Sequence, residues 1–245
     1  MLDLIGTIVL PAMIAVNITV IAKAMPVSSV TRLAIAAVVG AWSVLAAAVA
    51  AAGLFADTSP LFPWIGAFVA FPPVAVAAAA ALFPTARRAL LAIPLPTLVG
   101  VHIERVVGIF FLLLAWADRL GGPFPYSAGL GDIITGVAAI TVVRLAATGD
   151  ARHDGAISRW NAFGALDLFA AIALAVISSN GAPLQLIHAG AGPAAVLVLP
   201  WALIPSVVVP FYLITHGIVL AQLWARRASA SASTCTVPEA ASVAT

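Results

Sequence analysis

Seven long apolar runs dictate the kind of fold that this sequence can adopt. Crossing the hydrocarbon core of a bilayer takes about 20 apolar residues in a helix. The runs are continuously apolar rather than alternating, which favours helices over a β-barrel. They cover residues 4–22, 33–55, 63–83, 96–117, 126–143, 160–178 and 205–224. The sequence therefore predicts an all-α integral membrane protein, a seven-transmembrane-helix bundle.

The composition agrees with a single membrane domain. Hydrophobic residues make up 63% of the 245-residue chain and charged residues 8%, whereas soluble domains carry about 25% charged residues. The 11 Lys and Arg residues are spread between apolar runs, which excludes a nucleic-acid-binding surface. Cys235, the sole cysteine, allows no internal disulfide and no thiolate metal cluster. We expect one transmembrane domain over residues 1–227 and a disordered cytoplasmic tail, rich in Ala, Ser and Thr, over 228–245.

The distribution of basic residues predicts the orientation. With seven spans, Arg119 alone lies in a loop on one side, and nine Lys and Arg residues lie on the other. Positively charged loops stay in the cytoplasm, so the N-terminus is expected outside and the C-terminus in the cytoplasm. An excess of Arg over Lys with abundant Ala and Gly is typical of GC-rich bacteria, which places the protein in a bacterial cytoplasmic (inner) membrane. The nine residues are Lys23, Arg32, Arg87, Arg88, Arg144, Arg152, Arg159, Arg226 and Arg227.

Aromatic and proline residues add detail to this topology. Tryptophan and tyrosine are enriched at membrane interfaces; the expected outer belt is Trp64, Trp116, Tyr126 and Trp201, and the expected inner one is Trp160 and Trp224. Pro72 and Pro73 fall within the third span and should kink it. Residues 181–205 form an uncharged, apolar outer segment, which is either a re-entrant or interfacial cover of the bundle or a long structured loop.

Ionisable residues inside the spans are the candidates for function. Each costs about +2.5 to +3.5 kcal/mol on insertion scales, so each needs a reason to be there. By the helical rise of 1.5 Å per residue, Arg105 lies near the midplane. From there its side chain can reach Asp132, Asp167 or both, with His216 nearby. The six ionisable residues are His102, Glu104, Arg105, Asp132, Asp167 and His216.

Spacing along the helices predicts which groups share a face. His102 and Arg105 are three residues apart and lie on one face, whereas Glu104 and Arg105 are adjacent and do not face each other. Glycines share a face with each aspartate: Gly129 and Gly136 with Asp132, and Gly164 with Asp167. Small residues let a neighbouring backbone approach closely, so each acid is expected to be enclosed between helices.

The charge balance inside the spans is uneven. One fixed positive charge, Arg105, faces three formal negative charges, Glu104, Asp132 and Asp167. Unbalanced charge is costly in a low-dielectric interior. The site must therefore hold protonated carboxyls, protonated histidines, a bound cation, or a mixture of these. The alternative is a structural role, in which Arg–Asp pairs only fix helix register.

The polar residues and their neighbours resemble a family of small bacterial seven-helix membrane proteins of uncharacterised activity. The resemblance covers about residues 94–224 and brings no known activity or cofactor. It implies that Arg105, Asp132, Asn161, Asp167 and His216 match the polar positions of the family. The matching motifs are Arg105-Val-Val-Gly108, Gly131-Asp132, Trp160-Asn161 with Gly164 and Asp167, and His216 on the last span.

Three functions fit these observations. The first is a small-solute or proton-handling protein with a buried Arg/Asp/His site. The second is an accessory or sensory membrane subunit whose polar core is structural. The third is an intramembrane enzyme acting on a lipid or isoprenoid, with Asp132 or Asp167 as acid or base and His216 as partner. The bilayer is the expected surrounding, a small-molecule or lipid ligand is possible, and the sequence assigns no catalytic residue, metal, cofactor or protein partner. The candidates for binding a ligand or proton are Arg105, Asp132, Asp167, His216, His102, Glu104 and Asn161.

Overall fold

The computed structural model describes the backbone of residues 1–235 and the side chains of residues 1–229. Within these residues it is helical and without strands, and seven helices are long and apolar enough to cross a membrane. The prediction of an all-helical multi-pass fold is confirmed. The spans are Leu2–Ala24, Ser29–Ala51, Trp64–Leu82, Leu95–Trp116, Phe124–Ala147, Ala151–Ile177 and Ile204–Ser229.

The first four spans include one broken helix. Helices α1 (Leu2–Ala24), α2 (Ser29–Ala51) and α3 (Trp64–Leu82) are single, and α3 runs through both Pro72 and Pro73. The short α4 (Pro84–Leu91) follows. The fourth span consists of α5 (Leu95–Gly100), a 3₁₀ segment η1 (Val101–Gly108) and α6 (Ile109–Trp116). A long 3₁₀ stretch inside a helix is uncommon, and here it carries His102, Glu104 and Arg105.

The last three spans extend further than their apolar cores. Helix α7 covers Phe124–Ala147, and a short turn η2 (Ala151–His153) leads into α8 (Asp154–Ile177). After the 3₁₀ turn η3 (Ala194–Leu197), a π-helical turn η4 (Ile204–Val208) opens α9 (Val209–Cys235). Helix α9 thus covers the first eight residues of the expected disordered tail. The rest of that tail, residues 236–245, lies outside the described residues.

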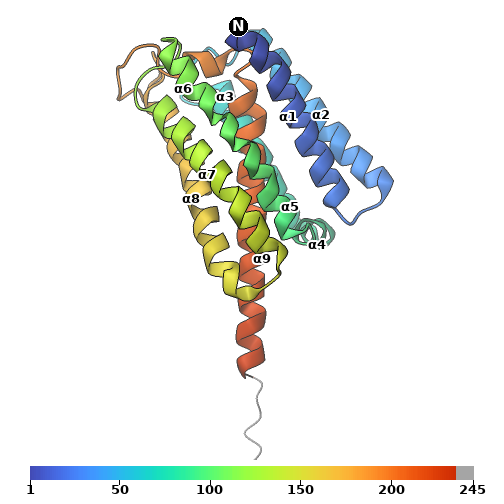
Figure 1. Ribbon diagram of the computed structural model, residues 1–245. Coiled ribbons are helices and arrows are strands. Elements are labelled where there is room, and N and C mark those ends of the chain that lie inside the picture. The colour runs from blue at the N-terminus through green and yellow to red at the C-terminus, as the bar shows by residue number, and fades with distance from the viewer. Residues whose placement is uncertain (236–245) are drawn as a thin grey trace, which may run out of the picture.

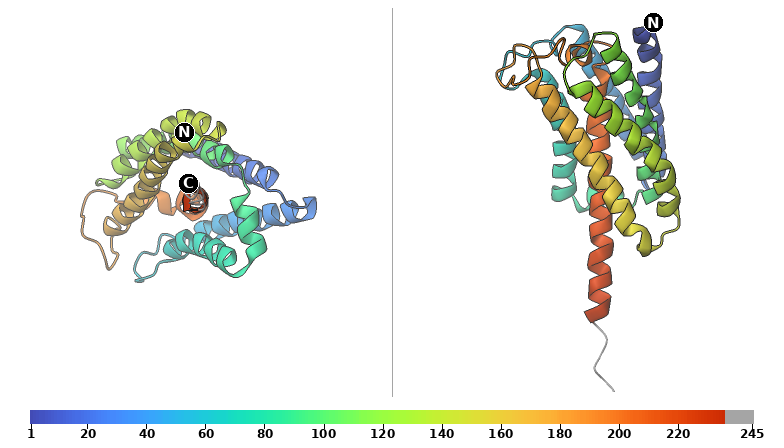
Figure 2. Two further views of the ribbon diagram at one scale, coloured as in Figure 1. Left: turned by 90° about the horizontal axis from the view of Figure 1, so that it is seen from below. Right: turned by 60° about the vertical axis from the view of Figure 1, so that its left-hand side comes forward.

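Helix α9 lies at the centre of the bundle. Figure 2 (left) shows α7 and α8 on one side of α9 and α2 and α3 on the other. Helices α3, α8 and α5 all pack against α9, and α1 pairs with α2 (Figure 1). Helices α2 and α3 bury little: α2 buries only Ala46 and Ala50, and α3 only Phe68. These two helices are therefore the loosely packed part of the molecule.

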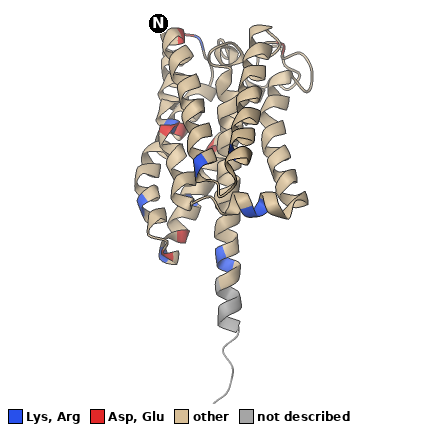
Figure 3. Ribbon diagram, turned by 90° about the vertical axis from the view of Figure 1, so that its right-hand side faces the viewer, with Lys and Arg blue, Asp and Glu red and all other residues tan. Residues whose placement is uncertain are grey.

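The N-terminus and the C-terminal part of α9 lie at opposite ends of the bundle, as an odd number of crossings requires (Figure 1). Most of the Lys and Arg residues lie toward the end from which α9 projects (Figure 3). Two contacts fasten that end: Arg226 Nη1 lies 3.2 Å from Asp154 Oδ1, and the Gln222 amide donates to the carbonyls of Leu91 and Ile93. The asymmetry agrees with the predicted topology, whose absolute orientation stays a prediction.

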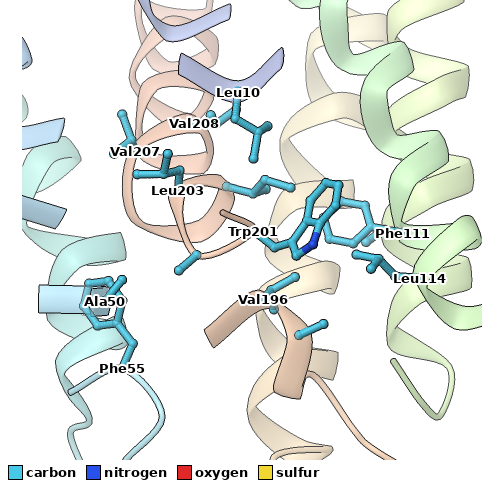
Figure 4. Packing of buried hydrophobic residues seen from close by; sticks show 14 of the residues in the cluster. Leu10, Ala50, Phe55, Phe111, Leu114, Val196, Trp201, Leu203, Val207 and Val208 are labelled. Carbon is cyan, nitrogen blue, oxygen red and sulfur yellow. The ribbon is translucent and has the colours of Figure 1, made fainter. Parts of the chain in front are cut away.

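The segment between α8 and η4 comprises residues 178–203. It covers one end of the bundle, and its second half enters the apolar core, where Figure 4 shows Trp201 pointing toward Phe111 and Leu114 of α6. Trp201 is fully buried, and its indole N–H donates to Asp3 Oδ1 at 2.7 Å. Trp201 therefore lies at the level of the end of α1, but it faces the core rather than an exposed interfacial belt, because this apolar segment folds inward.

Trp160 is a second correction to the aromatic belt. Its side chain is buried, and its indole N–H donates to the carbonyl of Thr135 on α7. Helix α8 begins at Asp154, six residues before the predicted span, and this places Trp160 inside the bundle rather than at its inner edge. The remaining predicted belt residues are all more than half exposed: Trp64, Trp116, Tyr126 and Trp224.

Candidate functional site

Arg105 is the centre of the buried polar cluster. Its side chain is 0% exposed, and its Nε donates to Asp132 Oδ1 at 2.7 Å while Nη2 donates to Asp167 Oδ2 at 2.8 Å. Nη1 donates to the carbonyl of Gly164 at 3.2 Å and contacts His216 Nε2 at 3.0 Å. Four of the five guanidinium N–H groups therefore have partners, on α7, α8 and α9.

The hydrogen bond from Arg105 determines which ring nitrogen of His216 carries the proton. Since the guanidinium can only donate, His216 Nε2 must accept and carry no proton. The proton then lies on Nδ1, which donates to Asn161 Oδ1 at 2.8 Å. The Asn161 amide completes the exchange by donating to the carbonyl of His216 at 3.1 Å. His216 is thus neutral, and it adds no positive charge to the cluster.

His102 lies directly against His216 in a second layer. The two ring centroids are 4.1 Å apart, and His102 Nε2 is 3.0 Å from Thr215 Oγ1. Because side chains three apart are eclipsed in a 3₁₀ helix, His102, Arg105 and Gly108 lie on one face of η1, and all three are buried. The predicted shared face of His102 and Arg105 is therefore present, although a 3₁₀ segment creates it.

Glycines bring the helices together around the cluster. A Cβ atom added at Gly108 would lie 3.0 Å from the carbonyl oxygen of Gly129, and one at Gly136 would lie 2.9 Å from the amide nitrogen of Val106. At Gly164 an added Cβ would lie 2.7 Å from the His216 ring. The predicted close approach at Gly129, Gly136 and Gly164 is confirmed, since no larger residue fits without a shift.

Glu104 does not join the Arg105 cluster. It points from another face of η1 toward Asn17 of α1, and the Tyr212 hydroxyl lies 3.4 Å from Glu104 Oε1. The Tyr212 ring lies beside the cluster, with its centre 5.4 Å from the Arg105 guanidinium carbon. The structure therefore brings six of the seven candidates together and leaves Glu104 apart.

Both aspartates reach the same guanidinium because they lie at similar depth. With α8 beginning at Asp154 and ending at Ile177, Asp167 lies near the middle of the helix. The apolar run alone placed it closer to the inner edge, because the run begins at Trp160. Asp132 lies eight residues into α7. The guanidinium lies between the two carboxylates and pairs with both. The sequence had left open whether Arg105 pairs with one aspartate or with both.

An apolar groove leads to this cluster from the side of the bundle, and it is called the lateral groove below. It has a volume of about 1270 Å³ and runs between α3 and α8 over α9. Four polar members of the cluster line it: Asp132, Asn161, Asp167 and His216. Arg105 itself does not line the groove, because the two carboxylates and His216 stand between it and the opening. A ligand in the groove therefore meets the acidic side of the cluster.

The charges of the cluster do not cancel. Arg105 carries one positive charge, Asp132 and Asp167 carry two formal negative charges, and His216 is neutral, so one negative charge remains. Each carboxylate uses one oxygen for Arg105, and the second oxygen of each has no hydrogen-bond donor among residues 1–229. No group of three or more His, Cys, Asp or Glu that could hold a metal ion occurs among the described residues.

Comparison with known proteins gives a family and no activity. A family described as Domain of unknown function (DUF8737) matches residues 62–224, which include α3 to most of α9 and all members of the cluster. The match begins about thirty residues before the resemblance seen in the sequence and leaves out α1 and α2. No curated protein and no solved structure matches the chain.

Proposed function

The chain belongs to the family described as Domain of unknown function (DUF8737), and we propose that this member is a proton-handling or small-solute-binding membrane protein whose site is the Arg105 cluster. Asp132 and Asp167 are the groups that exchange the proton or bind the solute. Arg105 holds both carboxylates in place, His216 accepts a hydrogen bond from Arg105, and Asn161 orients His216.

One observation carries the proposal: two carboxylates share one buried guanidinium and also line an open groove. A single unit of negative charge in a low-dielectric site is costly without a partner. Neutral His216 cannot supply the missing positive charge while it accepts a hydrogen bond from Arg105. Protonation of His102 would leave a buried N–H at Nδ1 without an acceptor among the described residues. A proton on a carboxyl or a cationic solute is the remaining source, and the groove gives either one access.

The groove also distinguishes this function from a purely structural role. An ion pair that only fixes helix register gains nothing from an opening, since exposure weakens it. The accessory-subunit hypothesis therefore explains the cluster but leaves the groove without a role. The enzyme hypothesis needs an acid or base next to a bound substrate, which Asp132 or Asp167 in the groove could provide. It makes the same prediction of a ligand site and adds a chemical step.

Infrared difference spectroscopy of the protein in lipid vesicles tests the proton-handling role. Stepping the pH from alkaline to acidic should produce the C=O stretching band of a newly protonated, buried carboxyl. The band should disappear or shift in Asp167→Asn or in Asp132→Asn, because each removes the surplus negative charge. Asp57→Asn is the control, since Asp57 lies in an exposed loop and should leave the band unchanged.

An absence of any protonated-carboxyl signal across the pH range would contradict the proposal, and so would a band that both variants leave intact. The first result means that the cluster holds no exchangeable proton. The second assigns the proton to another carboxyl, with Glu104 as the remaining acid inside the spans. A variant that loses its helical circular dichroism is not informative, so fold is checked first for each protein.

The proposed orientation places the N-terminus outside and the C-terminus in the cytoplasm of a bacterial inner membrane. The basic end of the bundle supports this arrangement through the bias of cytoplasmic loops toward Lys and Arg. Cys235, the sole cysteine, provides the test. A membrane-impermeant maleimide should label it in inside-out vesicles and leave it unlabelled in intact spheroplasts. The reverse pattern would overturn the orientation.

A further inference from the structure

We infer that the lateral groove binds a single-chain amphiphile with a cationic head group, whose ammonium pairs with the Asp132–Asp167 carboxylates and whose chain lies along α3 and α9. The inference rests on the proposed function, because it identifies the kind of solute that this site takes. The ligand enters sideways from the bilayer rather than along the axis of the bundle.

The dimensions of the groove suit a long apolar chain. Its volume of about 1270 Å³ exceeds the roughly 300–1,000 Å³ of ordinary small-molecule pockets. On α8 its lining extends from Asn161 to Val176, which is about 22 Å at a rise of 1.5 Å per residue. The carboxylates lie partway along this length. Space is therefore available on both sides of a head group bound there.

The walls of the groove are apolar and open outward. Helix α3 contributes Val74 and α8 contributes Phe169 and Val176, and these side chains are 64%, 59% and 41% exposed. Figure 2 (left) shows α3 and α8 standing apart with α9 between them. In a bilayer such walls contact hydrocarbon, so an alkyl chain can slide in without crossing a polar barrier.

The charge of the site selects a cation over an anion. The head group would meet Asp132 and Asp167, whose second oxygens lack donors, while Arg105 is fully buried behind them. His216 presents a neutral ring. Among the described residues that line the groove, Arg87 is the one basic side chain, and it lies on α4 at the far inner end. Charge complementarity therefore places an ammonium at the carboxylates.

A bound ammonium and a bound proton neutralise the same surplus charge, so they exclude each other. Binding of a permanent cation should release a proton from the cluster, and acidic pH should weaken the binding. The groups that face the exchanging carboxylates are Arg105 from η1 and Tyr212 and His216 from α9, with Arg87 as the only distant charge in the groove. None of these four is expected to take up the released proton.

The probe is dodecyltrimethylammonium, which has no titratable proton of its own. Binding of the radiolabelled probe, well below its micellar range, is measured on the full chain in nanodiscs of phosphatidylcholine. We expect saturable binding that weakens as the pH falls and is accompanied by proton release. Asp167→Asn should weaken it by about tenfold or more, the size of one lost charge-assisted contact. Neutral dodecanol and anionic dodecyl phosphate should compete poorly.

A groove variant separates this inference from the proposed function. Gly217 lines the groove beside His216, and a Cβ atom added there meets nothing within 4 Å. Gly217→Phe should therefore fill the groove without touching the ion pairs. We expect it to abolish probe binding while the carboxyl band in the infrared spectrum persists. Gly40→Phe is the matched control, because Gly40 also has open space around it but lies on α2, away from the groove.

Three results would overturn the inference. Binding that is unsaturable or equal in Asp167→Asn would mean that the probe only partitions into the bilayer. Competition by dodecyl phosphate that Arg87→Gln removes would assign the groove to an anionic head group instead. Full binding by Gly217→Phe would place the probe elsewhere. In each case, if the wild type still shows the infrared carboxyl band, the proposed proton site is unaffected by the result. Absence of that band from the wild type refutes the proposed function independently of probe binding.

Discussion

Replacing Gly131 by alanine should push Asp167 away from Arg105. Gly131 on α7 packs against the Asp167 carboxylate of α8, and a Cβ atom at this position would lie 1.7 Å from Oδ1 and 2.2 Å from Cγ. Ordinary contact begins at 3.4 Å, so the carboxylate must retreat by about 1.7 Å. That movement breaks the 2.8 Å bond between Asp167 Oδ2 and Arg105 Nη2.

The expected net effect of Gly131→Ala, with the full helix-propensity gain of alanine subtracted, is a destabilisation of about 0.5–2 kcal/mol. Losing a hydrogen bond to a charged group costs about 1.5–3 kcal/mol. Alanine in place of glycine inside a helix stabilises the helix by up to about 1 kcal/mol. Gly40→Ala measures this helix-propensity gain alone, because an added Cβ at Gly40 contacts nothing within 4 Å. The two alanine variants should therefore change stability in opposite directions.

The free energy of unfolding can be measured by circular dichroism as sodium dodecyl sulfate is titrated into mild-detergent micelles. A double-mutant cycle with Asp167→Ala identifies the cause. Without the carboxylate the added methyl group has nothing to displace, so Gly131→Ala should be neutral or stabilising in that background. Equal destabilisation in both backgrounds, or a Gly131→Ala protein as stable as Gly40→Ala, would refute the reasoning.

Three further substitutions address other parts of the structure. Arg105→Met leaves two buried carboxylates without their cation and should cost about 3–5 kcal/mol of unfolding free energy; a loss below about 1 kcal/mol would mean that the acids are already protonated together. Asn161→Ala removes two hydrogen bonds of His216 and should cost about 1–3 kcal/mol, while nitrogen NMR should still show the Nδ1–H tautomer, because Arg105 still donates to Nε2; a switch to the Nε2–H tautomer would contradict the assigned network. Trp201→Phe keeps an aromatic ring but drops the bond to Asp3, so hydrogen exchange in residues 178–203 should accelerate by the equivalent of about 0.5–1.5 kcal/mol, and unchanged protection would show that packing alone holds the segment.

The number of crossings and the identity of the polar residues follow from the sequence alone. Hydropathy is a sum over neighbouring residues, so a run such as 4–22 indicates a span whatever surrounds it. A charge inside such a run stands out for the same reason, which is how Arg105, Asp132 and Asp167 were found. The glycine spacing also predicted close helix contacts, because small residues three or four apart share one face.

Helix ends were predicted less well, with consequences for the site. Arg152 and Arg159 are polar enough to end an apolar run, yet α8 begins at Asp154, because polar residues continue a helix into the membrane interface. This shift placed Trp160 inside the bundle and Asp167 at the depth of Arg105. The 3₁₀ geometry of η1 left no pattern in the hydropathy, since an eight-residue stretch of either helix type is equally apolar.

Only the tertiary structure decided how the polar groups pair. From the sequence, Arg105 could pair with either aspartate, and Glu104 was as much a candidate for the site as Asp132 and Asp167. Pairing depends on how each helix is rotated and how far it slides against its neighbours, and contacts between distant residues such as Gly108 and Gly129 fix these quantities. The proton position on His216 and the open groove beside the carboxylates likewise depend on packing across α3, α8 and α9, which no local pattern records.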